Sequence, residues 1–118
     1  MHELSVCRSL LREVERAAAM HGAERVSRIV ITVGALSGVD AALLKRAFDA
    51  ARAGTLAEGA ALDIEISPIM VRCEACGRDT AAKINELTCR GCGDGRVRVL
   101  SGDELLLKRV ELSVAANS

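Results

Sequence analysis

The sequence predicts an α+β fold in which two helices cover one face of a three-stranded sheet and a four-cysteine, zinc-ribbon-like domain is inserted before the last strand. Segments of helical and strand periodicity follow one another along the 118 residues in the order helix, strand, helix, strand, strand. Two Cys-x-x-Cys-Gly motifs lie between the last two strands. We therefore expect an α+β domain of residues 1–71 plus 99–118 and a zinc-binding domain of residues 72–98.

The first helix is expected from residue 4 to about residue 21, because apolar residues recur at spacings of three and four and form one stripe. Gly22 is its expected C-terminal stop. The next segment, Arg25 to Val33, is rich in β-branched residues and predicts a strand. The stripe of the helix consists of Leu4, Cys7, Leu11, Val14 and Ala18.

A turn at residues 34–38 leads into the second helix, which is expected from about Asp40 to Ala53. Ser37 and Asp40 are the candidate caps, because their side-chain oxygens accept the free amide protons of a first helical turn. Gly54 is expected to end this helix. Its apolar face consists of Leu43, Leu44, Ala47, Phe48 and Ala51.

Two further strands are expected, from Leu62 to Ser67 and from Asp103 to Val114, because apolar and polar residues alternate in both. The short segments between these strands and the cysteine motifs, near residues 69–72 and 97–102, are expected to act as hinges. The tail, residues 115–118, is expected to be frayed. The apolar positions expected to share a face are Leu62, Ile64 and Ile66 in the first strand and Leu106, Val110 and Leu112 in the second.

The composition limits the class of partner. The chain has 16 basic and 16 acidic residues, so its formal net charge is zero, and Phe48 is its only aromatic residue. Binding of nucleic acid by bulk electrostatics or by base stacking is therefore not expected. No apolar run approaches the length of a membrane span, and no signal-peptide pattern is present. We expect a cytoplasmic protein that contacts neither nucleic acid nor membrane.

The two cysteine motifs have the spacing of a tetrahedral zinc site. In a reducing compartment, paired cysteines hold metal more often than they form disulfides. Four thiolates leave no open coordination position, so we expect a structural zinc ion rather than a hydrolytic centre. Four thiolates also accept iron, whereas a thioredoxin-like redox pair lacks its βαβ context here. The predicted zinc ligands are Cys73, Cys76, Cys89 and Cys92; Cys7 is expected to be a small buried hydrophobe.

The N-terminal residues form a second candidate metal site. A free α-amine on Met1, the next amide nitrogen and the imidazole of His2 can close fused chelate rings around one metal ion. Ni²⁺ and Cu²⁺ favour such tetragonal nitrogen sites, and Zn²⁺ favours them much less. Glu3 can add a carboxylate or its own amide. An incidental histidine on a frayed terminus is the simpler interpretation of the same residues.

Several motifs together resemble one known family. The chain opens with Met1-His2-Glu3, and Gly-Ala-Leu-Ser-Gly-Val follows the first strand at residues 34–39. Gly-Thr-Leu-Ala-Glu-Gly-Ala stands at residues 54–60, and Ser-Gly-Asp-Glu-Leu at residues 101–105 follows the two cysteine motifs. In this order and spacing, nearly the whole chain resembles the HypA/HybF family, the nickel metallochaperones of [NiFe]-hydrogenase maturation.

The resemblance implies a function without catalysis. It implies Ni²⁺ bound weakly and reversibly by the amine of Met1, a backbone nitrogen and the imidazole of His2, with Glu3 and Asp40 beside that site. It implies zinc on the four cysteines. As partners it implies a HypB-type nickel GTPase and the [NiFe]-hydrogenase large subunit and, for some members, urease and its accessory proteins. The sequence leaves open whether the chain is a monomer or a homodimer.

Two other classes of protein fit parts of the sequence. A zinc-ribbon module that binds protein or nucleic acid would use the cysteines alone, without nickel transport. An iron-binding, rubredoxin-like electron carrier would use the same four thiolates. A colourless protein that holds one zinc ion would exclude the electron carrier, and a nickel titration separates the other two classes.

Overall fold

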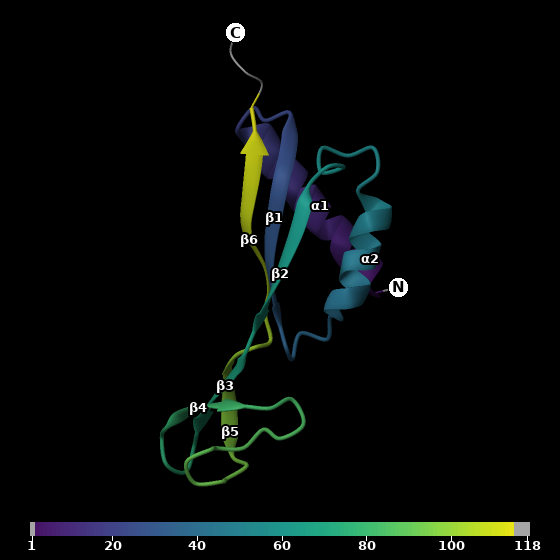
Figure 1. Ribbon diagram of the computed structural model, residues 1–118. Helices are drawn as coiled ribbons and strands as arrows, with labels where there is room; N and C mark the ends of the chain where they lie inside the picture. The colour runs from purple at the N-terminus through teal and green to yellow at the C-terminus, as the bar shows by residue number, and fades with distance from the viewer. Residues whose placement is uncertain (1, 115–118) are drawn as a thin grey trace. The chain divides into compact units, whose positions relative to one another are not determined.

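The computed structural model describes residues 2–114, so Met1 and the predicted frayed tail lie outside the described residues. Within residues 2–114, no helix combines the length and the apolar character needed to span a bilayer. The described part of the chain forms two helices and six strands (Figure 1). They are α1 His2–Met20, β1 Arg25–Gly34, α2 Ala41–Ala51, β2 Ala61–Ser67, β3 Ile69–Cys73, β4 Asp79–Ala82, β5 Val97–Ser101 and β6 Leu105–Ser113.

The chain divides into two compact units. Unit 1 comprises residues 1–31, 40–64 and 107–118, and unit 2 comprises residues 32–39 and 65–106. Three strands in the order β2-β1-β6 form one sheet, and three strands in the order β4-β3-β5 form another. The predicted division at residues 72–98 stays a prediction.

The core of unit 1 lies between the two helices and one face of β1 and β2. Side chains of both helices and both strands line a common, nearly filled space there, so α1 and α2 cover the same face of the sheet, as predicted. The expected apolar stripes are buried where they meet this core. The residues that meet there are Cys7, Leu10, Leu11, Val14, Ile29, Ile31, Leu44, Phe48 and Leu62.

The second sheet belongs to unit 2 and was not predicted. The segments expected to be hinges are strands: β3 pairs antiparallel with β4 on one side and with β5 on the other. Val71 in β3 is 0% exposed and Ile69 is 3% exposed, so this small sheet buries apolar side chains of its own. The hinge prediction was therefore wrong, because each segment is too short to show strand periodicity before its partners are known.

Two strands depart from the predicted faces. Ile66 in β2 is 58% exposed and Leu106 in β6 is 55% exposed, although both were expected on an apolar face. In β6, the adjacent residues Lys108 and Arg109 are both exposed, which shifts the alternation by one residue. Leu105 and Leu107 are therefore half-buried before the shift, and the predicted Val110 and Leu112 are half-buried after it.

Two motifs of the resemblance meet through their backbones in unit 2. The amide of Gly34 donates to the carbonyl of Glu104 (2.7 Å), and the amide of Leu36 donates to the carbonyl of Gly102 (2.6 Å). A Cβ atom on Gly34 would overlap the carbonyl of Gly102, which itself has a φ of 105°. Both positions therefore require glycine.

Candidate metal centre

Two equivalent turns carry the four cysteines. In the first, the amide of Gly77 donates to the carbonyl of Cys73 (2.9 Å), and in the second the amide of Gly93 donates to the carbonyl of Cys89 (2.8 Å). Both glycines have a φ of 78°, which a side chain would strain. Each Cys-x-x-Cys-Gly motif therefore folds into the same tight turn and directs its two sulfur atoms to one side.

The residue after each glycine closes its turn, a role that the sequence analysis missed. The amide of Cys73 donates to the carbonyl of Arg78, and the amide of Cys89 donates to the carbonyl of Asp94, both at 2.9 Å. Arg78 and Asp94 each directly follow the glycine of a Cys-x-x-Cys-Gly motif. This equal spacing was visible in the sequence and could have indicated that the two residues have the same role. The hydroxyl of Thr80 on β4 also accepts the amide of Arg90 (3.2 Å), which ties the second turn to β4.

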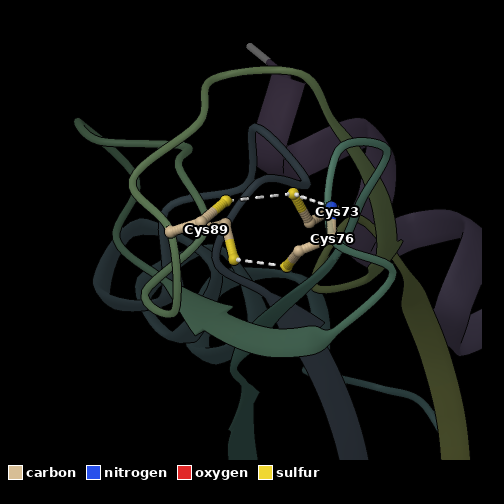
Figure 2. A group of neighbouring side chains, drawn as sticks. Cys73, Cys76 and Cys89 are labelled. Atoms are coloured by element: carbon tan, nitrogen blue, oxygen red, sulfur yellow. Dashed lines mark hydrogen bonds between the residues drawn. The ribbon is translucent and has the colours of Figure 1, made fainter.

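The four predicted cysteines converge on one point of unit 2. Figure 2 shows the sulfur atoms of Cys73, Cys76 and Cys89 pointing toward one another, and the ligand atoms of all four cysteines lie within 4.8 Å of one another. The sulfur atoms of Cys73 and Cys92 are 3.6 Å apart, as are those of Cys76 and Cys89. A disulfide requires about 2.05 Å. With metal–sulfur bonds of about 2.3 Å, a tetrahedral site has sulfur–sulfur edges of about 3.8 Å, so the donor set fits one tetrahedral ion.

The first cysteine of each motif is prepared to be a thiolate. The amide of Cys76 donates to the sulfur of Cys73, and the amide of Gly91 donates to the sulfur of Cys89, each at 3.3 Å. The backbone amides of Cys92 and Gly91 lower the pKa of Cys89 to about 6. The pKa of Cys73 is also lowered, chiefly by the amide of Cys76. Hydrogen bonds to the charged form have this effect and favour a metal ligand.

The second cysteine of each motif faces solvent. Cys73 and Cys89 are each 1% exposed, whereas Cys76 and Cys92 are exposed. The amide of Asp94 lowers the pKa of Cys92, but the neighbouring thiols and desolvation outweigh it and raise that pKa to about 11. Cys92 therefore keeps its proton near neutral pH until a cation replaces it. Metal binding at this site therefore releases protons.

The predicted N-terminal site lies at the start of α1 in unit 1. The imidazole Nδ1 of His2 is 3.5 Å from Oε2 of Glu3, and the His2 side chain is 60% exposed. The same Glu3 oxygen accepts the backbone amide of Asp40 (3.2 Å). This hydrogen bond is the largest cause that lowers the pKa of Glu3. The structure therefore brings His2, Glu3 and Asp40 together across 37 residues of sequence; Met1 lies outside the described residues.

Asp40 has a structural role at the same point. Its carboxylate accepts the amide of Leu43 (3.0 Å), so Asp40 is the N-cap of α2, as predicted. Ser37, the other candidate, instead accepts the amide of Val39 within the preceding turn. The cap satisfies one of the four free amides of the first turn. A metal ion that took the Asp40 carboxylate would compete with this cap.

Substitution of Asp40 separates these two roles. Asp40→Asn retains a capping oxygen, and we expect thermal stability close to that of the original chain. Asp40→Ala removes the cap and is expected to lower the free energy of unfolding by about 1 kcal/mol. If the carboxylate also binds metal, both variants weaken nickel binding to the same extent. Thermal unfolding and a nickel titration on both variants measure this, and an asparagine variant that binds nickel normally would limit Asp40 to capping.

The fold and the cysteine tetrad define a class: a small α+β protein with a four-cysteine metal-binding site, whose four sulfur donors leave no open coordination position for a substrate. Residues 1–112 match the family described as "Hydrogenase/urease nickel incorporation, metallochaperone, hypA". The chain therefore belongs to the HypA family. Members of this family are metallochaperones and maturation factors and not enzymes.

Individual relatives cover almost the entire chain. "Hydrogenase maturation factor HypA" of Nitrosospira multiformis is 50% identical over 112 residues, which are 95% of this chain and 97% of the relative. The protein of the same name from Aquifex aeolicus is 38% identical over 97% of this chain and 99% of its own. The solution structure of the Ni metallochaperone HypA from Helicobacter pylori covers 95% of this chain and 97% of its own, with 27% identity and a TM-score of 0.69. The family and fold suggested by the sequence motifs are thereby confirmed.

Proposed function

We propose that this protein is a nickel carrier that binds Ni²⁺ reversibly at its N-terminus and delivers it for [NiFe]-hydrogenase maturation. The nickel ligands in this proposal are the amine of Met1, a backbone nitrogen and the imidazole of His2, with the carboxylates of Glu3 and Asp40 beside them. Zinc is the ion of the cysteine tetrad. The recipients are a HypB-type nickel GTPase and the hydrogenase large subunit, with urease accessory proteins as further partners, all in the cytoplasm.

The observation that carries the proposal is the hydrogen bond between Glu3 and the amide of Asp40 (3.2 Å). It brings the backbone of Asp40, the N-cap of α2, to the start of α1, where His2 stands 3.5 Å from Glu3. The first amides of a helix have no intrahelical acceptor, so the amide nitrogen of His2 can become a metal ligand, whereas the amide of Glu3 donates to its own carboxylate. Imidazole and amide nitrogens in a tetragonal arrangement suit Ni²⁺ better than Zn²⁺.

The two proposed metals suit two different sites. The tetrad is a closed set of four sulfur donors, which favours a permanent ion and suits zinc. The N-terminal group is exposed and contains nitrogen and oxygen donors, which favours exchange with solution. This division lets one ion hold the fold while the other is cargo.

A native N-terminus is the condition that tests the proposal. Ni²⁺ is titrated into protein that begins at Met1 and into protein extended by Gly-Ser ahead of Met1. The extension moves the free amine away and breaks the fused chelate rings, so we expect nickel affinity to fall at least tenfold while the zinc content stays at one per chain. Equal nickel affinities in the two proteins would refute the N-terminal carrier.

A further inference from the structure

Residues 94–96, which directly follow the second cysteine motif, connect the two cysteine turns of unit 2. The carbonyl of Asp94 accepts the amide of Cys89 in the second turn (2.9 Å). The carbonyl of Arg96 accepts the amide of Glu74 in the first turn (2.9 Å). Neither hydrogen bond uses a sulfur atom, so both are compatible with a metal ion on the four sulfurs. The segment therefore holds the two turns in one relative orientation.

One side-chain pair fixes the shape of this segment. The carboxylate of Asp94 accepts the backbone amide of Arg96 (2.7 Å). It also accepts the guanidinium of Arg96 through Nε (3.1 Å) and Nη2 (2.9 Å). Such two-point pairs of arginine and carboxylate are charge-assisted and geometrically specific. We call residues 94–96, held by this pair, the turn clamp.

The geometry of the tetrad depends on the orientation that the turn clamp sets. The sulfur atoms of Cys73 and Cys92 are 3.6 Å apart, as are those of Cys76 and Cys89, so each close pair joins the first turn to the second (Figure 2). A rotation of one turn against the other would change the arrangement of all four sulfurs. The hydrogen bonds of the turn clamp are too weak to replace a metal ion, but they favour one orientation while the ion is bound.

The orientation of the turns bears on which ion the tetrad accepts. Affinity alone does not separate Ni²⁺ from Zn²⁺, and proteins distinguish such ions by geometry and by the type of ligand. Zinc in structural sites is tetrahedral, whereas Ni²⁺ favours square-planar or tetragonal arrangements. A chain that carries nickel exposes its own thiolates to that ion. Turns that hold the four sulfurs in a tetrahedron therefore protect the site from the cargo.

We propose that the turn clamp determines the metal specificity of the tetrad, because it holds the four sulfurs in a tetrahedron and thereby keeps carried Ni²⁺ from displacing zinc. The inference rests on the proposed function, which assigns zinc to the tetrad and nickel to the N-terminus. Asp94 is a positioning residue in this proposal: its carboxylate binds Arg96 and acts on the sulfurs only through the two turns.

The test measures which ion the tetrad selects. Zinc-loaded protein is titrated with Ni²⁺, and nickel on the cysteines is followed by thiolate-to-nickel charge-transfer absorption, which nitrogen and oxygen ligands at the N-terminus do not produce. Metal analysis after removal of free ions gives the zinc that remains. For Asp94→Ala, we expect the ratio of nickel to zinc at which half of the tetrads hold nickel to fall about tenfold, as is typical for the loss of a group that orients metal ligands.

Two further variants test the pair itself. Arg96→Ala removes the same interaction from the other side and is expected to lower the ratio to the same extent. The double variant should lower it no further than either single variant, because both lose one shared interaction. Asp94→Asn retains an oxygen for the amide of Arg96, so its ratio is expected to lie between those of Asp94→Ala and the original chain.

Asp79→Ala is the matched control. Asp79 also pairs with an arginine through two hydrogen bonds, from Nε (2.8 Å) and Nη2 (3.0 Å) of Arg72. This pair joins β4 to β3 and does not connect the two cysteine turns. We expect the ratio for Asp79→Ala to stay within about twofold of the original value. A tenfold fall in this control would assign the effect to the loss of any carboxylate from unit 2 and would overturn the proposal.

The ratio separates metal specificity from stability. A substitution that only loosens unit 2 weakens zinc and nickel binding in parallel and leaves the ratio unchanged. An unchanged ratio in both Asp94→Ala and Arg96→Ala would therefore refute the turn clamp, and so would an original chain whose tetrad takes nickel in preference to zinc. Equal nickel affinities with and without the Gly-Ser extension would refute the N-terminal carrier and leave this ratio measurable, so the two proposals fail separately.

Discussion

Cys89→Ser is expected to remove the tetrad metal and to unfold the sheet of unit 2. Cys89 is 1% exposed, lies 3.6 Å from the sulfur of Cys76 and accepts the amide of Gly91, so no neighbouring group replaces it as a ligand. A structural zinc ion contributes on the order of 10–16 kcal/mol to the folding of a small domain. Such a contribution is as large as the typical stability of an entire domain, about 5–15 kcal/mol, so its loss is enough to unfold this sheet.

The unfolding should be confined largely to the strands that the tetrad connects. Cys73 ends β3, and its amide and carbonyl hold the first turn against Arg78 and Gly77. Without the metal, the two turns lose the ion that joins their four sulfur atoms, and a backbone hydrogen bond from the amide of Glu74 to the carbonyl of Arg96 (2.9 Å) is a weak substitute. We expect the slow amide exchange of Val71 and Val99, which face each other across β3 and β5, to become fast.

Metal analysis and amide exchange measured by NMR decide this prediction, and Cys7→Ala is the matched control. Cys7 is also buried, at 2% exposed, but it lies in the core of unit 1 among apolar side chains. Its removal is expected to cost about 1 kcal/mol as a small cavity and to leave the metal in place. One tightly bound metal ion per Cys89→Ser chain would contradict the proposed role of the tetrad.

The parts of the fold that were predictable have strong local signals. The apolar stripe of α1 and the β-branched run of β1 are long enough to show their periodicity without knowledge of the partner elements. The sheet of unit 2 lacks such a signal, because β3, β4 and β5 have four or five residues each and mix apolar, polar and charged side chains. They are stabilised by pairing and by the cysteine turns, which only the tertiary structure shows.

The same distinction applies to the two candidate metal sites. The tetrad could be predicted because all its ligands lie in two motifs of fixed spacing. The contact between Glu3 and the amide of Asp40 joins residues 37 apart and depends on how α1 packs beside α2. Only the resemblance placed Asp40 near the N-terminus, whereas its role as the cap of α2 could be predicted from its side chain and its position before the apolar face of the helix.

His2→Ala is expected to abolish detectable nickel binding and to leave the tetrad metal in place. The imidazole is the one neutral side-chain nitrogen ligand in the proposed site, and the alanine variant leaves only an amine, an amide and the two neighbouring carboxylates. Because the side chain is 60% exposed and lies in the first turn of α1, its loss should not alter folding. Calorimetric titration with Ni²⁺, together with metal analysis, measures both effects, and simultaneous loss of both metals would show that the sites are not separate.

The dependence on pH identifies which groups compete with the metal. Nitrogen ligands must release protons before nickel binds, so nickel affinity should rise with pH between about 5 and 8. Glu3 does not contribute in this window, because the Asp40 amide lowers its pKa and the carboxylate is already ionised. Because the pKa of Glu3 is lower in the folded chain than in the unfolded chain, its ionised carboxylate stabilises the fold at any pH above the unfolded-state pKa. This stability is lost only as the pH falls through the folded-state pKa, which lies below the window from 5 to 8. Glu3→Gln should therefore weaken nickel binding without changing the shape of the pH profile between 5 and 8, whereas a profile that flattens would show that Glu3 carries the competing proton.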